Sequence, residues 1–88
     1  MDAKLRRRLL FILHRGLAEA QLLAMAGKIE QITDLADALE GLPGCLDCWN
    51  EEHLVTIRFN LETYASKHPD SRFEYVRYLD EYDPPGHF

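Results

Sequence analysis

The sequence predicts an all-α fold, a small bundle of about four helices with a long N-terminal helix. Three observations support this prediction. Residues 3–26 contain no proline and are rich in Leu, Ala, Arg and Glu, all of which are good helix formers. Residues 29–40 carry their apolar side chains at helical spacing. Two later segments begin with residue types that commonly cap helices.

The length and composition indicate one ordinary globular domain. The chain has 88 residues, of which 47% are hydrophobic and 28% charged, so it can form one core but is short for two domains. We expect a single helical domain over residues 1–82. Residues 83–88 contain two consecutive prolines and should form an irregular C-terminal tail.

The first helix carries one broad apolar stripe that should face the core. Within it, Gly16, Ala20 and Ala24 recur every four residues, which allows another helix to approach closely. This small-residue row fits packing within the chain, its usual role in water, or a dimer seam. The whole stripe comprises Leu5, Leu9, Ile12, Leu13, Gly16, Ala20, Leu23 and Ala24.

A second apolar set lies on nearly the opposite face of this helix. It consists of Phe11, Ala18, Leu22 and Met25. A helix of 24 residues is about 36 Å long, so it should cross the whole domain, and three shorter segments would have difficulty covering both faces. Either the helix is sandwiched by its neighbours, or these four residues form the seam of a homodimer.

The second helix should begin after Gly27 and end near Gly41 and Pro43. Its apolar residues fall on one side of the helix and its acidic residues on the other. Gly41 is available for the left-handed position that closes a helix, and Pro43 marks the stop.

The third helix should run from an Asn50 cap to a break at Pro69, with Trp49 and Leu54 forming a hydrophobic staple. An alternative remains, because apolar and polar residues also alternate strictly over residues 54–61, the period of a strand. In that case residues 72–79 would form its hairpin partner. Length and the absence of turn residues favour the helix.

The fourth helix should start at Ser71, whose hydroxyl can cap it while Glu74 completes a capping box. The surface of this helix combines aromatic and acidic side chains. Tyrosine supplies rigid contact area, and an acidic rim steers basic partners, although these rings could equally close the edge of a small core. The candidate partner-binding residues are Tyr75, Tyr78, Asp80, Glu81 and Tyr82.

The charge distribution argues against nucleic acid and membrane as partners. The net charge is -5, and residues 29–88 carry four Lys or Arg against thirteen acids, so much of the surface should repel phosphate. The apolar run Leu9 to Leu13 follows basic residues but is too short for a secretory signal or a membrane span. We expect a cytoplasmic protein with reduced cysteines.

The sharpest chemical motif is Cys45-Leu46-Asp47-Cys48, expected on a loop before the third helix. One such pair is not a zinc site, since structural zinc needs four ligands, and His53 with a further histidine would have to converge on it. Neighbouring acids disfavour the reactive thiolate of a redox pair. Cys45, Cys48 and His53 are thus weak metal candidates, and incidental cysteines are the simpler interpretation.

The sequence contains no recognisable catalytic constellation. Its two serines, Ser66 and Ser71, lie near expected helix ends without a nucleophile-elbow pattern, and Gly41 to Gly44 lacks the lysine of a phosphate loop. We therefore predict no enzyme and no cofactor.

Two stretches, Leu35 to Pro43 (LADALEGLP) and His68 to Val76 (HPDSRFEYV), resemble a group of small uncharacterised helical bacterial proteins. That resemblance implies no activity. Size, acidity and helix content are also similar to those of immunity proteins that neutralise nuclease toxins, but the tyrosine-rich binding motif of that class is not found. The sequence thus favours a non-enzymatic protein–protein interaction module, such as an adaptor, a regulator or an immunity-type protein, that could act as a homodimer. The alternative is a metal- or redox-responsive module using Cys45 and Cys48.

Overall fold

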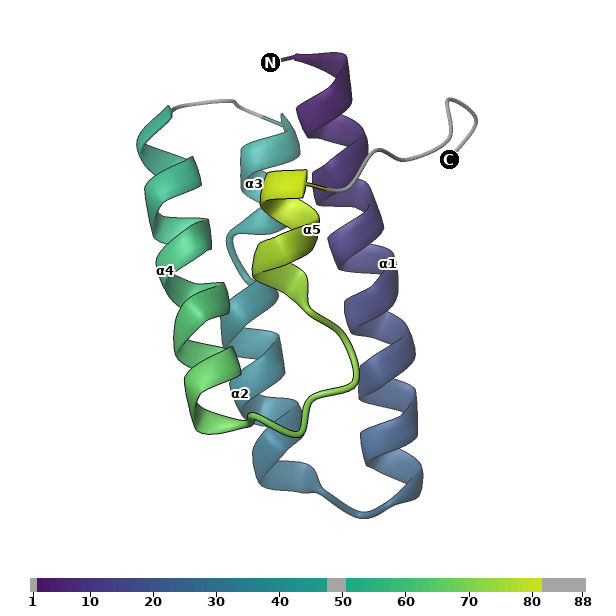
Figure 1. The fold of residues 1–88 in the computed structure, drawn as a ribbon. Coiled ribbons are helices and arrows are strands. Elements are labelled where there is room, and N and C mark those ends of the chain that lie inside the picture. The colour runs from purple at the N-terminus through teal and green to yellow at the C-terminus, as the bar shows by residue number, and fades with distance from the viewer. Residues whose placement is uncertain (1, 48–50, 82–88) are drawn as a thin grey trace.

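The computed structural model describes residues 2–47 and 51–81, and over these residues it is an all-α bundle (Figure 1). The predicted fold class is therefore confirmed. The helices are α1 (Ala3–Met25), α2 (Ile29–Leu39), α3 (Leu42–Asp47), α4 (Glu51–Lys67) and α5 (Tyr75–Glu81). The described residues contain no strand, so the hairpin alternative for residues 54–61 and 72–79 is wrong. Residues 48–50 and 82–88, with the predicted Asn50 cap, the Trp49 staple and the C-terminal tail, lie outside the described residues.

Four of the helices form a ring around the core. α1 packs against α2 and α5, and α4 packs against the same two helices, while the short α3 contacts α1 and α4. Figure 1 shows α5 lying across the front between α1 and α4. The long dimension of the bundle is 37 Å, which matches a helix of 23 residues at about 1.5 Å per residue.

Both ends of α1 have specific caps. The carboxylate of Asp2 accepts a hydrogen bond from the backbone N–H of Lys4 at 3.1 Å. At the other end Gly27 has a φ of 72°, a conformation that glycine adopts without steric cost. The N–H of Gly27 donates to Ala24 and that of Lys28 to Leu23, which is the Schellman pattern. The predicted end of the first helix is confirmed.

The junction between α2 and α3 differs from the expected stop and loop. Gly41 is not left-handed, since Gly27 is the described glycine with positive φ. Glu40 keeps a right-handed helical conformation, and α3 begins at Leu42. Pro43 is tolerated because the first turn of a helix needs no intrahelical N–H bond. The prediction that Cys45 lies on a loop is therefore wrong, because α3 carries it into the core.

Two arginines near the start of α1 hold the last turns of the short helices. Arg6 Nη1 donates to the carbonyl of Leu46 in α3, and Arg8 Nη1 donates to that of Leu79 in α5, both at 3.2 Å. Carbonyl groups at helix C-termini lack intrahelical partners, and a cation there also complements the helix dipole. The basic residues that precede the apolar run of α1 thus take part in the fold.

Gly16 of α1 lies in tight contact with Leu39 of α2, as expected from its place in the small-residue row. It is buried, and a Cβ built on it would overlap the Leu39 Cδ1 methyl and lie 3.2 Å from Cδ2. Of the rest of the row, Ala20 packs against the core, and Ala24 is exposed. Gly16 therefore serves packing within the chain.

We expect Gly16→Ala to lower the free energy of unfolding by about 1 kcal/mol, measured by urea denaturation. The gain in helix propensity is about 1 kcal/mol, but overpacking in a core costs about 1–3 kcal/mol. Gly44→Ala is the matched control, because its added methyl meets nothing within 4 Å, and it should be neutral or stabilising. A stabilising effect of Gly16→Ala would show that Leu39 moves aside at no cost.

Candidate functional site

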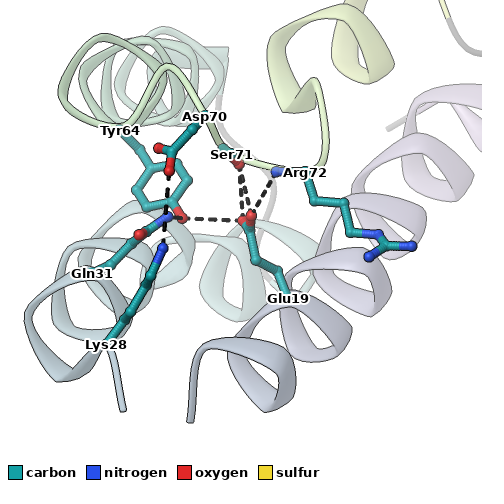
Figure 2. Close-up of polar contacts among 7 residues, drawn as sticks. All are labelled: Glu19, Lys28, Gln31, Tyr64, Asp70, Ser71 and Arg72. Carbon is teal, nitrogen blue, oxygen red and sulfur yellow. Dashed lines mark hydrogen bonds and ion pairs between the residues drawn. The ribbon is translucent and has the colours of Figure 1, made fainter. Parts of the chain in front are cut away.

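The most connected polar group in the bundle is the carboxylate of Glu19, near the middle of α1. Glu19 is 3% exposed. Its Oε1 accepts hydrogen bonds from the hydroxyls of Tyr64 at 3.1 Å and Tyr75 at 2.8 Å. Ser71 Oγ lies 2.8 Å from Oε2 and 3.0 Å from Oε1, and the backbone N–H of Arg72 donates to Oε2 at 3.0 Å (Figure 2). These donors come from α4, α5 and the segment between them.

The network extends from Glu19 into α2. Gln31 Nε2 donates to the Tyr64 hydroxyl at 3.1 Å, and that hydroxyl donates onward to Glu19. The rings of Tyr64 and Tyr75 are 6.1 Å apart between centroids. Four helices and the segment of residues 68–74 therefore meet in one hydrogen-bonded cluster, which we call the Glu19 cluster. It consists of Glu19, Gln31, Tyr64, Ser71, Arg72 and Tyr75.

The chemistry available to the Glu19 cluster is limited by its own bonds. Burial, followed by the hydrogen bond to Glu19, raises the pKa of Tyr75, and burial is also the main cause of a raised pKa at Tyr64. These phenols are therefore poor proton donors at neutral pH. Because Glu19 already accepts from four groups, both of its oxygens are occupied. The arrangement is suited to holding the segment of residues 68–74 on α1.

A second polar contact ties this segment to α2. His68 Nε2 lies 2.7 Å from Asp34 Oδ2, and both side chains are largely buried. The His68 ring stacks at a tilt on Tyr64, 5.0 Å between centroids. Lys28 and Asp70 approach to 4.0 Å at the surface (Figure 2), and such an exposed pair contributes little to stability.

The predicted capping box at Ser71 is wrong. α5 begins at Tyr75 rather than at Ser71, and the Ser71 hydroxyl donates to Glu19. Phe73 lies in the irregular segment, where its ring and that of Phe11 both contact the Arg15 guanidinium, 5.7 Å and 4.9 Å from the ring centroids. The buried acceptor on α1 competes with a local cap for the serine hydroxyl, and the nonlocal bond forms.

The predicted partner-binding residues are mostly engaged within the chain. Tyr75 is buried in the core, so its side chain is not at the surface. The Tyr78 ring packs edge-on against Phe11, 5.1 Å between centroids. Asp80 forms a bidentate ion pair with Arg58 of α4, which lowers its pKa. Glu81 accepts from Arg77 Nε at 3.0 Å, and Tyr82 lies outside the described residues.

The predicted dimer seam on α1 is divided in two. Phe11 is buried under α5, and Ala18 is half-buried. Leu22 and Met25 stay exposed, Met25 by 85%. α5 thus covers the seam at its N-terminal end and leaves the C-terminal end open. Phe11 is not available to a second chain.

The structure describes residues 45–47 of the cysteine motif. The Cys45 side chain is fully buried in the core, and this burial raises the pKa of its thiol. His53 is exposed, and it lines with Cys45 a shallow hollow of about 240 Å³ between α3 and α4. Cys48 lies outside the described residues. Within the described ranges, no group of three His, Cys, Asp or Glu side chains could hold a metal ion.

Sequence reasoning missed Glu19, although a signal was present. Ile12, Gly16, Glu19 and Leu23 follow one another by four, three and four residues, so Glu19 lies on the same face as the buried stripe. A charged residue on an apolar helix face indicates a buried polar partner set. The hydroxyls of Tyr64, Ser71 and Tyr75 supply that set, together with a backbone amide.

No protein-family model, curated protein or solved structure is significantly similar to the chain. No helix in the described part of the chain is long and apolar enough to cross a membrane.

We expect Glu19→Gln to lower the free energy of unfolding by about 2–3 kcal/mol, because an amide cannot accept at both positions and leaves buried donors unpaired. Urea denaturation measures this effect. Glu62→Gln, at an exposed position of α4, is the matched control and should be neutral. A neutral Glu19→Gln would mean that the cluster contributes nothing to stability.

The raised pKa values of Tyr64 and Tyr75 predict a loss of stability at alkaline pH. A tyrosine in the unfolded chain ionises at about pH 10, whereas the folded protein keeps these two phenols protonated to higher pH. Their stabilising contribution is full below about pH 10 and is lost as the pH rises above it. Urea denaturation across this range should give a shallower decline for Tyr75→Phe than for the wild type. If absorbance shows that every tyrosine is ionised at about pH 10 while the protein is still helical, this expectation is contradicted.

Proposed function

We propose that the chain is a non-enzymatic protein–protein interaction module. The observation that carries the proposal is that many polar groups are bonded within the chain, whereas several large apolar side chains are exposed. Several groups that could take part in acid–base chemistry are already bonded within the chain: Glu19 with Tyr64 and Tyr75 inside the bundle, and His68 with Asp34 in a partly buried pair. Large apolar side chains, in contrast, are exposed on two separate faces. Exposed apolar groups that lie close together are typical of interaction surfaces.

The first apolar surface lies where α1 turns into α2. Met25 is 85% and Ile29 66% exposed, and Leu17 and Leu22 are also exposed nearby on α1. Leu22 and Met25 belong to the seam expected from the sequence. Two copies could pair through this apolar surface in a symmetric arrangement, in which the same patch is buried on both chains. A homodimer is the simplest assembly that it supports.

The second apolar surface lies on α4. Val55 is 71% and Phe59 67% exposed, and the two residues are one turn apart on the same side of the helix. An exposed phenyl ring lowers solubility, whereas burying it in a complex contributes about 2–3 kcal/mol to the binding free energy. Its exposure supports a binding role for this face.

The alternative metal- or redox-responsive role receives less support. Thiolate is the form of cysteine that attacks disulfides and binds metals, and burial of Cys45 disfavours that form. A buried thiol is in keeping with the reducing compartment expected for this chain, so we place the module in the cytoplasm as part of the proposal.

The proposal is tested by photo-crosslinking in cells that naturally produce the protein. Benzoylphenylalanine is placed at Met25 or at Phe59, with exposed Glu74 as the control position. We expect covalent adducts from at least one of the first two positions and none from Glu74. An adduct of twice the chain mass from Met25 identifies a homodimer. If neither Met25 nor Phe59 gives an adduct while the protein is present and folded, the interaction function is refuted.

A further inference from the structure

We propose that the face between α2 and α4, centred on Phe59, binds a basic amphipathic segment of a protein partner. This proposal rests on the interaction function above and names the chemistry of its partner. It draws on the shape around Phe59, the sign of the charges beside it, and the way the other acids of the bundle are already used.

Phe59 stands between two hollows in the surface. On the α2 side it borders a small one of about 100 Å³, lined also by Asp34, Asp37 and Thr63. On its other side lies a shallower, wider one of about 440 Å³ that includes Glu62 and Lys67. The ring is therefore accessible from both sides, and Val55 extends the apolar strip by one turn. An apolar side chain of a partner can enter either hollow while covering the ring.

The charges that flank this ring are mainly negative. Glu30, Asp34 and Asp37 follow at intervals of four and three residues, so they share one face of α2. α2 contains no Lys or Arg. Glu62 adds a carboxylate on the α4 side. An acidic partner segment would be repelled here, and a basic one attracted over roughly the Debye length of about 8–10 Å.

The acids on this face differ in how much they are used by the fold. Asp34 is held by His68, whereas Asp37 is exposed and has no hydrogen bond or ion pair among the described residues. Lys67, at the end of α4, is the cation that borders both hollows. A basic side chain of the partner therefore fits beside Asp37 rather than beside Lys67.

The α1–α2 surface does not compete for the same ligand. Its exposed apolar side chains are Leu17, Leu22, Met25 and Ile29. A basic segment gains charge complementarity on the α2–α4 face, where Asp34, Asp37 and Glu62 line the hollows. A second copy of the chain has a net charge of -5 and is as a whole a less favourable ligand for this face than a basic segment. We therefore assign this face to a basic partner rather than to self-association.

The experiment uses the full chain and a labelled amphipathic peptide of about 14 residues, or four turns, built only from Leu and Lys. Fluorescence anisotropy should report saturable binding that weakens as salt rises from about 0.05 to about 0.5 M. Amide chemical shifts should change along α2 and α4, around Asp37 and Phe59. A Leu–Glu peptide of the same spacing is the matched ligand control and should not bind.

The variants separate this face from the rest of the surface. Phe59→Ser and Asp37→Lys should each weaken binding of the Leu–Lys peptide by about tenfold, as expected for a central aromatic anchor and for charge reversal. Leu17→Ser and Glu74→Lys are matched controls at other exposed positions and should leave the affinity unchanged. Circular dichroism confirms that each variant is folded, as expected for exposed sites.

Several results would overturn the proposal. They are the absence of binding up to about 1 mM peptide, equal binding of the Leu–Glu peptide, or unchanged affinity in both Phe59→Ser and Asp37→Lys. Sedimentation that shows self-association lost in Phe59→Ser would assign the face to a second copy instead. In each case crosslinking from Met25 and Phe59 in cells tests the interaction function independently of the peptide, so the two failures are distinguishable.

Discussion

The carboxylate of Glu19 lies inside the bundle, and its described hydrogen-bond partners are two phenols, a serine hydroxyl and a backbone amide rather than a cation. Burying a carboxylate is costly unless such donors replace its water. Three of the four donors lie between Ser71 and Tyr75. Glu19 is satisfied only when this part of the chain closes over α1, so the placement of residues 71–75 on α1 depends on this acid.

α5 illustrates the dependence. It has seven residues, and isolated helices shorter than about 12–15 residues are marginal in water. α1 holds it at both ends, through Glu19 bonded to Tyr75 at its first residue and Arg8 bonded to the Leu79 carbonyl in its last turn. The edge contact between Phe11 and Tyr78 fills the interval. α1 therefore serves as the template on which the short helix forms.

The sequence predicts features that depend on neighbouring residues, and it does not predict those that depend on contacts with residues far away in the chain. The end of the first helix before Gly27 and the close approach at Gly16 follow from residue type and spacing. The short α3 was missed because Gly41 and Pro43 permit a turn or a helix start equally, and packing of Leu42 and Cys45 in the core selects the helix. Ser71 and Tyr75 were misplaced because Glu19, more than fifty residues away in the chain, takes their hydroxyls. Tyr75 is withdrawn from the predicted acidic tyrosine face for the same reason.

An excess of acidic residues does not by itself identify the surface that meets a partner. Glu19 is hydrogen-bonded in the core, Asp34 is paired with His68, and Asp80 is paired with Arg58. A carboxylate bonded in this way contributes less free energy to binding a ligand, because the new contact must first replace an existing one. The acids that matter for binding are those left unused beside an exposed apolar anchor. In the described chain Asp37 and the exposed Phe59, which line the same hollow, form such a combination, and this supports the proposed binding face between α2 and α4 rather than one on α5.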